Sequence, residues 1–208
     1  MPSGPVVVVP PTLVDEWVAA HESEFRPPIG NKLMHRGRCV SVMFVGGPNA
    51  RTDFHSSEGS EVFVQLRGTA EVVTIQRGKR KVVTIPQGSV FGLPSRVPHS
   101  PQRLKNTVGL VLERQRTPGT EFDRMTWFRD FATCDEVEWE RYFPCVDLGT
   151  DLKPVAEEYA ARKRAAAAAG RALVPPAPQE QPCPPHEPWR GDVPDPQPLL
   201  RVMREAVA

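Results

Sequence analysis

Short apolar runs of strand length fill the middle of this 208-residue chain. Many are rich in β-branched residues, and turn signals such as Gly46-Gly47-Pro48 and Gly88 separate them. Strands that recur about every 8 to 12 residues between such signals are typical of an antiparallel sandwich or barrel. The predicted strands are residues 39–45, 61–66, 70–76, 81–85, 89–93, 107–113 and 125–128. We therefore expect an all-β fold, with a jelly-roll barrel as the first choice.

Two segments outside the strands have the pattern of helices. In residues 11–25, apolar side chains recur at helical spacing, and Thr12 is placed to cap the first turn. After Pro154, residues 155–169 are rich in alanine and charged side chains, and Gly170 follows where a helix commonly ends in a left-handed residue. The pattern predicts one helix before the barrel and one after it.

The C-terminal part of the chain is dominated by proline. Residues 171–198 hold ten of the 24 prolines and few apolar side chains. Such a tract cannot build a packed core, so we expect an extended strap across the surface or disorder. The expected division is an N-terminal helix and arm at 1–38, the barrel at 39–150, a C-terminal helix at 151–170 and a proline-rich tail at 171–208. Within the tail, residues 199–208 have room for one or two helical turns.

Charge and hydropathy narrow the class of protein. The chain has 26 basic and 25 acidic residues, for a net charge of +1, and no basic patch predicts a nucleic-acid partner. No apolar run approaches the roughly 18 residues that a membrane span needs, and the run of valines at 6–9 is too short for a signal peptide. We expect a soluble, cytoplasmic protein with no membrane partner.

The four cysteines do not form a recognisable framework. None belongs to a C-x-x-C pair, and their scatter is unlike that of a secreted disulfide scaffold. We expect four reduced thiols, with Cys39 buried as a small hydrophobic residue in a strand.

Two short segments carry the chemistry of the chain. They supply His55 with Glu61, and His99, and an arginine accompanies each segment, at Arg51 and Arg103. Two histidines and one carboxylate are the ligand set of non-haem ferrous oxygenases, which leave about three of six iron positions open for substrate and dioxygen. The arginine fork matches a carboxylate. This combination points to oxygen activation on a small acid that chelates iron.

The period-two alternation of strands puts these residues on shared faces. If each segment is extended, every face that carries a metal ligand also carries a candidate substrate group, as a site in a barrel mouth requires. The sets are Arg51, Asp53 and His55; Glu61, Phe63 and Gln65; His99, Pro101 and Arg103; and Gly109, Val111 and Glu113.

The spacing of these residues resembles the two motifs of cupin jelly rolls. Glu61 and Gly68 match the end of the first motif, and Gly88, Pro94 and His99 match the second. The first motif usually begins His-x-His, whereas this chain has Asp53-Phe54-His55. The resemblance leaves His55, Glu61 and His99 as ligands. Asp53 is then expected in a supporting role rather than as a fourth ligand.

Longer strings resemble the 3-hydroxyanthranilate 3,4-dioxygenase family over roughly residues 10–152. They are Asn31-Lys32-Leu33-Met34-His35, Val45-Gly46-Gly47-Pro48-Asn49, Asp53-Phe54-His55, Val97-Pro98-His99-Ser100-Pro101-Gln102-Arg103, Asn106-Thr107-Val108-Gly109-Leu110-Val111 and Asp147-Leu148-Gly149-Thr150. The resemblance implies a catalytic Fe(II) ion and a small aromatic substrate that meets O2 there. The product would be 2-amino-3-carboxymuconate semialdehyde, which cyclises to quinolinate, a precursor of NAD.

The resemblance also implies roles for residues around the iron. Arg51 and Arg103 would hold the substrate carboxylate or the nearby oxygen, and Glu113 would bind and help to deprotonate the amine or hydroxyl. Arg51 and Glu113 are thus the expected catalytic residues. Asn31, Phe63 and Pro101 would shape the pocket. A homodimer is expected because members of the family are usually dimers.

One feature departs from the family pattern. Single-domain members commonly carry two C-x-x-C pairs for a second iron, and this chain has neither pair, so no second metal is expected. Two alternatives stay open. One keeps the mechanism but changes the substrate to a substituted 3-hydroxyanthranilate or another ortho-aminophenol carboxylate; the other is a non-catalytic cupin that binds a small carboxylic acid. His21, His35 and His186 are expected to be structural or exposed.

Overall fold

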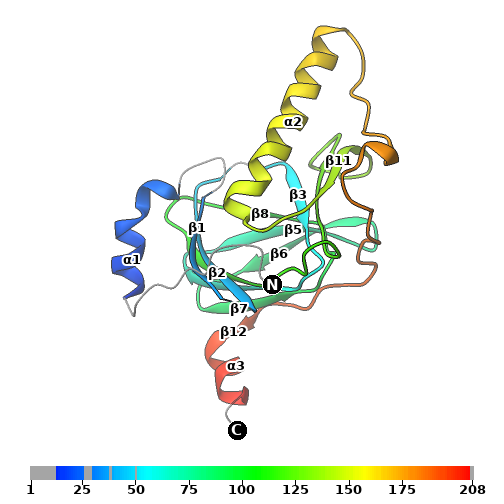
Figure 1. Cartoon of the computed structure of the whole chain (residues 1–208). Helices are drawn as coiled ribbons and strands as arrows, with labels where there is room; N and C mark the ends of the chain where they lie inside the picture. The colour runs from blue at the N-terminus through cyan, green and yellow to red at the C-terminus, as the bar shows by residue number, and fades with distance from the viewer. Residues whose placement is uncertain (1–12, 26–29, 38, 50, 207–208) are drawn as a thin grey trace.

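The barrel consists of two six-stranded antiparallel sheets packed face to face (Figure 1). The computed structural model describes residues 13–25, 30–37, 39–49 and 51–206. The first sheet has the order β1-β2-β9-β4-β7-β12, and the second has the order β11-β10-β3-β8-β5-β6. The strands of the first sheet are β1 (Asn31–Arg36), β2 (Val40–Gly46), β9 (Val108–Arg114), β4 (Glu61–Arg67), β7 (Ser89–Leu93) and β12 (Gln197–Pro198). Those of the second are β11 (Val137–Phe143), β10 (Asp123–Phe128), β3 (Asp53–Ser56), β8 (His99–Arg103), β5 (Ala70–Gln76) and β6 (Lys79–Ile85).

Alternation along the strands builds the core between the two sheets. On β4, Glu61, Phe63 and Gln65 are buried whereas Val62 is exposed, as the period of two requires. The main apolar cluster takes residues from both sheets, including Met43, Phe63, Val72, Phe91, Leu93, Val111, Met125 and Trp139. The predicted all-β jelly roll with a helix at each end is confirmed.

All seven predicted strands are present, and five further strands escaped the prediction. β1 lies at a sheet edge and is only partly buried, so its alternation is weak and it was assigned to the N-terminal arm. β8 reads His-Ser-Pro-Gln-Arg, a polar sequence without apolar alternation, although His99, Pro101 and Arg103 are buried. β3 has four residues and β12 has two. β11 does alternate, with Trp139 and Phe143 inward, and this signal was overlooked.

The two flanking helices differ in how well they were predicted. α1 (Val14–Ala20) is followed by the 3-10 turn η1 (Glu22–Glu24), and the proposed cap at Thr12 lies outside the described residues. α2 (Leu148–Ala168) begins seven residues before its predicted start and contains Pro154. Burial of Leu152 offsets the cost of a proline inside the helix.

The ends of α2 have clear local causes. The Asp147 side chain accepts a hydrogen bond from the Gly149 N–H and so caps the first turn. At the other end, Gly170 has φ of 62°, its N–H bonds the Ala167 carbonyl, and the Arg171 N–H bonds the Ala166 carbonyl. This is a Schellman motif, and the predicted glycine stop is confirmed.

Residues 171–198, which we call the strap, contain one short 3-10 turn, η2 (Pro178–Glu180), and contact the second sheet at β11, through Gln181, and at β5, through Val193. The strap then adds β12 to the first sheet and continues into α3 (Leu199–Ala206), which projects from the barrel in Figure 1.

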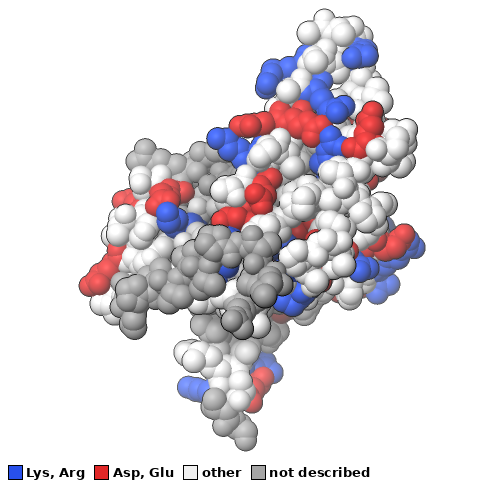
Figure 2. Space-filling view, in the orientation of Figure 1, with Lys and Arg blue, Asp and Glu red and all other residues white. Residues whose placement is uncertain are grey.

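The cysteines and the charged surface complete the picture. All four cysteines are free, as predicted, but Cys39 is exposed just before β2, so its predicted burial is wrong. On the face shown in Figure 2, acidic and basic side chains are interspersed rather than gathered by sign. Among the described helices, none is both long and apolar enough to cross a membrane.

Candidate metal centre

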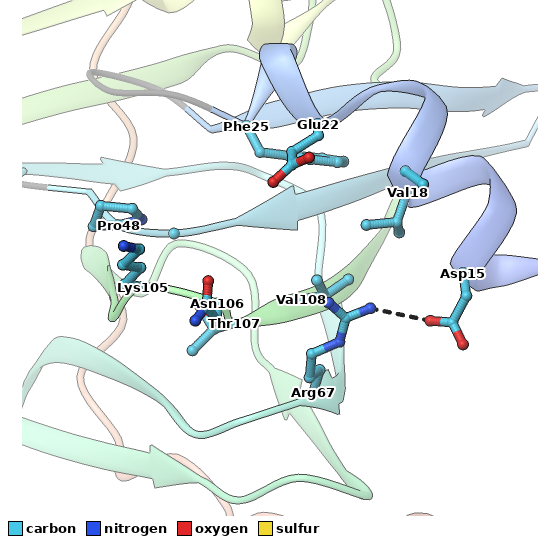
Figure 3. Close-up of a pocket in the computed structure, with 12 residues that line it drawn as sticks. Asp15, Val18, Glu22, Phe25, Pro48, Arg67, Lys105, Asn106, Thr107 and Val108 are labelled. Atoms are coloured by element: carbon cyan, nitrogen blue, oxygen red, sulfur yellow. Dashed lines mark hydrogen bonds and ion pairs between the residues drawn. The ribbon is translucent and has the colours of Figure 1, made fainter.

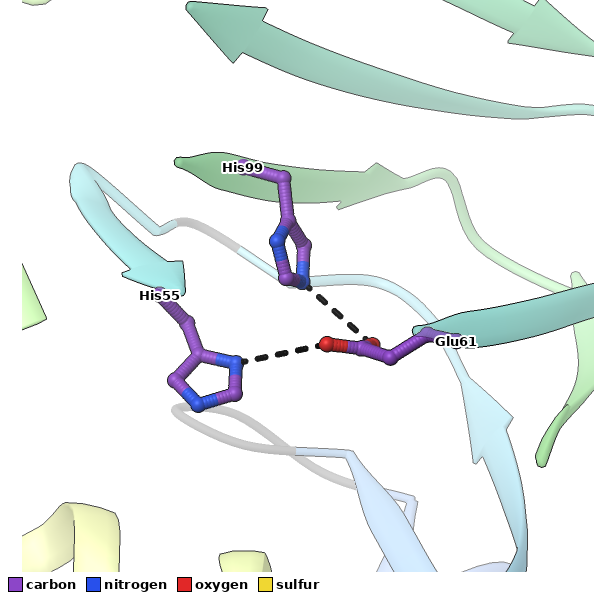
Figure 4. A group of neighbouring side chains, drawn as sticks. All are labelled: His55, Glu61 and His99. Atoms are coloured by element: carbon purple, nitrogen blue, oxygen red, sulfur yellow. Dashed lines mark ion pairs between the residues drawn. The ribbon is translucent and has the colours of Figure 1, made fainter. Parts of the chain in front are cut away.

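Three buried side chains converge between the two sheets. His55 and His99 lie on the neighbouring strands β3 and β8 of the second sheet, where they are direct register partners. Glu61 is the first residue of β4 in the first sheet and faces them (Figure 4). One ligand atom from each residue can be chosen so that all three lie within 4.8 Å of one another. Within the described residues this is the group able to hold a metal ion.

Each imidazole is oriented by a hydrogen bond on its far side. His99 directs Nε2 to a Glu61 oxygen at 3.5 Å, and its Nδ1 lies 3.0 Å from the Val97 carbonyl. His55 directs Nδ1 to the other Glu61 oxygen at 3.8 Å, and its Nε2 lies 2.6 Å from Oδ2 of Asp123. A ring N–H that donates outward leaves the inward nitrogen with a free lone pair, the state that a metal requires.

The titration of these groups follows from their burial and mutual contact. Burial by itself would raise the pKa of Glu61, but the neighbouring histidines, His99 first, lower it overall. Burial would lower the pKa of His99, and Glu61 raises it overall. The carboxylate is therefore ionised and ready to act as a ligand.

The donor set fits a divalent transition metal. Two imidazole nitrogens and one carboxylate are the facial triad that non-haem iron sites use, and both rings are already turned with one nitrogen toward Glu61. The side chains of His55, Glu61 and His99 are at most 5% exposed. An ion bound here would be shielded from bulk water by both sheets.

Arg51 and Arg103, the two predicted carboxylate-binding residues, have different surroundings. Arg51 makes an ion pair with Asp53, with its Nε 3.2 Å from each carboxylate oxygen. This pair raises the pKa of Arg51 against the effect of burial and lowers that of Asp53. Asp53 therefore neutralises Arg51 and is not among the residues grouped around a metal position.

Arg103 is a buried cation without a carboxylate partner. Its residue is 8% exposed, its Nε atom has no hydrogen-bond partner, and no ion pair involves it in the described part of the chain. The residues outside the described ranges include no aspartate or glutamate, so none of them offers an acidic side chain as a partner for Arg103. Burial and the charge of Arg51 lower the pKa of Arg103 to about 9. Within the described residues Arg103 thus has no ion-pair partner, and the Glu61 charge only partly offsets the lowering of its pKa.

Glu113 closes the other side of the site. Glu113 on β9 is the backbone register partner of Glu61 on β4, and Arg116 donates a hydrogen bond to its Oε2 at 2.9 Å. Its Oε1 is buried without a partner. Burial raises the pKa of Glu113 to about 7 despite the nearby Arg116. Asn31 and Glu113 line one small cavity of about 10 Å³, which has room for about one water molecule.

The other predicted pocket residues lie beside the triad. Phe63 meets the His99 ring edge-on, with centroids 6.1 Å apart. Pro101 lies on β8, and its carbonyl accepts a hydrogen bond from Asn49 at 2.9 Å. The same Asn49 side chain accepts from the Arg103 N–H at 2.8 Å, so it fixes the end of β8.

Two important residues were missed in the sequence. Asp123 is fully buried, and Arg116 holds it through two hydrogen bonds, from Nε at 2.6 Å and from Nη2 at 2.7 Å. Arg116 thereby links Asp123, which orients His55, to Glu113. Asp123 shares its strand face with Met125 and Trp127. An acidic residue in line with two large apolar residues is a sequence signal that predicts a buried carboxylate, and this signal could have identified Asp123.

A hollow of about 390 Å³ lies away from this centre, between α1 and the turns around Pro48 and Asn106 (Figure 3). Asp15 and Arg67 pair across its rim at 3.0 Å. Its lining includes none of the triad, so its size is no guide to the chemistry.

Fold and site together define a class: a jelly-roll barrel with a buried group of two histidines and one carboxylate that can hold a metal ion. The profile of the 3-hydroxyanthranilic acid dioxygenase family matches residues 6–160. The chain belongs to that family.

Curated relatives carry the name of the same enzyme family. Proteins named 3-hydroxyanthranilate 3,4-dioxygenase from Rattus norvegicus and Homo sapiens are each 47% identical over 146 residues, which is 70% of this chain and 50% of theirs. The chain therefore spans about half the length of the curated relatives it matches. A solved cupin-2 domain protein from Shewanella frigidimarina is 17% identical with a TM-score of 0.37, covering 47% of this chain and 91% of that one. At that level the likeness adds nothing about function.

Proposed function

We propose that the protein is an iron(II)-dependent dioxygenase that cleaves the ring of 3-hydroxyanthranilate to give 2-amino-3-carboxymuconate semialdehyde. Family membership supports the reaction type, and the relatives' name supplies the substrate. The observation that carries the proposal is the combination in one site of the buried triad and a buried Arg103 whose Nε has no hydrogen-bond partner.

The proposed iron ligands are His55, Glu61 and His99, which already converge. When bound, Fe(II) would supply a place for the substrate's oxygen and amine to chelate beside O2. Hydrogen bonds behind the two rings keep one nitrogen of each histidine directed at that place. The Val97 carbonyl orients His99, and the Asp123 carboxylate orients His55.

Arg103 is the best candidate for holding the substrate carboxylate. A buried carboxylate is costly without a charged partner, and a buried guanidinium has the same need. Arg51 is already neutralised by Asp53, so we assign it a second role, next to Arg103, in orienting the same end of the substrate. Phe63 and Pro101, with Asn31 at the sheet edge, would shape the pocket around the ring.

Glu113 is the proposed proton acceptor. One of its oxygens is held by Arg116 while the other is buried and unpartnered, which leaves that oxygen available for an amine or hydroxyl proton of the substrate. Both oxygen atoms that the ring gains on cleavage would come from one O2 molecule, so the reaction needs no external reductant.

The test is anaerobic reconstitution with Fe(II), followed by 3-hydroxyanthranilate and then O2, with ultraviolet–visible spectra recorded beside a His99→Ala control. Growth of the semialdehyde band in the wild type alone supports the proposal. Binding of iron and substrate without O2 uptake would contradict it and favour a non-catalytic acid binder. O2 uptake with substituted analogues only would move the proposal to the specialised substrate.

A further inference from the structure

The strap lies beyond the region that the family profile matches, which ends at residue 160. It nevertheless makes ordered contacts along the second sheet. The Gln181 side chain bonds the backbone of β11 twice, accepting from the Tyr142 N–H at 3.0 Å and donating to the Glu140 carbonyl at 3.2 Å. His186 is 9% exposed and meets the Tyr142 ring edge-on at 5.3 Å. The strap is therefore docked through specific groups.

The next contact of the strap reaches the loop that precedes His99. The Trp189 N–H donates to the Arg96 carbonyl at 3.1 Å. Further along, the Val193 N–H donates to the Gln76 side chain at 3.1 Å, and Asp192 pairs with Lys81 at 2.6 Å. The strap is thus anchored on both sides of Trp189.

Arg96 is a junction between this strap and the metal-binding segments. Its N–H donates to the Ser57 carbonyl at 2.7 Å, and its side chain pairs with Glu58 at 2.7 Å. Ser57 and Glu58 belong to the loop that joins His55 to Glu61. One residue of the loop before His99 therefore holds the loop before Glu61 and is held by the strap.

The backbone of Arg96 needs such support. Its φ is 64°, a left-handed conformation that a side chain such as arginine rarely adopts. A residue in that region persists where surrounding contacts determine it. The next peptide carbonyl is that of Val97, the group that orients the His99 ring at 3.0 Å. A change in the Arg96 peptide would therefore turn the acceptor of His99.

We propose that the strap is a positioning element of the metal centre: the Trp189 backbone fixes the Arg96 peptide and, through the Val97 carbonyl, sets the direction of the His99 nitrogen that faces Glu61. This inference rests on the proposed function, because it takes the triad as the metal site. It assigns a task to a segment outside the family profile.

The first test compares Trp189→Pro with Trp189→Ala in the full-length protein, without substrate or O2. Both variants lose the indole, but only proline removes the N–H that reaches Arg96. Co(II) serves as the probe because its absorption bands report ligand geometry, and its affinity is measured by competition with a chelator. Groups behind metal ligands typically change affinity about 10–100-fold. Because Trp189 acts one step further out, we expect a 3–10-fold weaker affinity in Trp189→Pro than in Trp189→Ala, with altered cobalt bands.

A merely structural strap would give a different result. Trp189→Pro would then lower the melting temperature, while Co(II) affinity and bands would equal those of Trp189→Ala, and this outcome overturns the inference. If the wild type binds no Co(II), the proposed function and the inference both fail. Wild-type binding with indistinguishable variants removes the inference alone.

A second measurement needs no variant and covers the case in which Trp189→Pro does not fold. Coupling between two sites is reciprocal, so a strap that favours metal binding must be stabilised by the metal. Amide hydrogen exchange, resolved by residue, should slow at Trp189 when Co(II) is added to the wild type. The Gly170 N–H, which closes α2 away from the site, is the control. Equal changes at both amides would overturn the inference.

Discussion

Replacement of Arg103 by methionine should stabilise the ligand-free protein. Methionine keeps an unbranched apolar stem and removes a buried charge that has no ion-pair partner within the described residues. The pKa of Arg103 falls from 12.5 to about 9, and this difference corresponds to about 5 kcal/mol that favours the uncharged form. Relaxation and water entry reduce such penalties. We therefore expect a gain of about 1–3 kcal/mol, or roughly 2–10 °C in melting temperature for a chain of this size.

The assay is urea unfolding of metal-free protein at neutral pH, with Arg51→Met as the matched control. Arg51 has the same side chain nearby, but its removal leaves Asp53 buried without its cation. That variant should lose about 1–3 kcal/mol, because breaking a buried pair uncovers the remaining charge. The two arginine-to-methionine changes are thus predicted to have opposite signs.

The pH dependence and ligand response sharpen the test. Between about 9 and 12.5 the unfolded state keeps the Arg103 proton more readily than the native state, so wild-type stability should recover relative to Arg103→Met as pH rises through 9. Benzoate, a small aromatic carboxylate, should raise the melting temperature of the wild type only. A loss of stability in Arg103→Met comparable to that in Arg51→Met would refute the assignment of Arg103 as a buried charge without an ion-pair partner.

Three further outcomes follow from single contacts. Asp123→Asn should weaken Co(II) binding about 10–100-fold in chelator competition, because the carboxylate at 2.6 Å orients His55; unchanged affinity would remove Asp123 from the site. Burial, and after it a neighbouring arginine, lowers the pKa of His186 below 6.5, so the unfolded state binds the proton more readily as pH falls. The His186→Leu variant should therefore lose less stability than the wild type between pH 6.5 and 4.5. Parallel curves of unfolding free energy against pH, measured in urea, would contradict this. A Cβ at Gly47 would lie 2.1 Å from the Leu104 carbonyl oxygen, so Gly47→Ala should lower the free energy of unfolding by about 2 kcal/mol or more, measured by thermal unfolding. Gly92→Ala is the control, because a Cβ there would meet open space. Equal losses in the two variants would refute the clash.

Most strands were predictable from local alternation, and the grouping of the triad was predictable from the motif spacing and the family resemblance. Phe63 and Glu61 share a face on β4 by simple alternation, and the structure buries both. His55 and His99 were predicted as ligands of one metal ion from the resemblance and the motif spacing, and they occupy register positions opposite each other. The proline-rich composition correctly indicated that residues 171–198 build no core of their own.

Other features depend on contacts that no local pattern encodes. Asp123 and Arg116 become important because three strands bring them to His55 and Glu113, and nothing in their own neighbourhood specifies those partners. The start of α2 was misplaced because Pro154 reads as a boundary, whereas burial of Leu152 carries the helix through it. The apolar neighbours of Cys39 predict burial, but Cys39 is exposed just before β2.

The placement of Glu61 in one sheet and the two histidines in the other has a mechanical consequence. An ion held by all three would be a cross-link between the layers of the barrel, closing the short loop from His55 to Glu61 and the longer one from Glu61 to His99. Ligand that binds only the folded state adds about 2.7 kcal/mol of stability at a hundred times its dissociation constant. Removal of the metal by a chelator would therefore destabilise the packing of the two sheets as well as abolish activity. The melting temperature of the barrel should rise with the concentration of free metal.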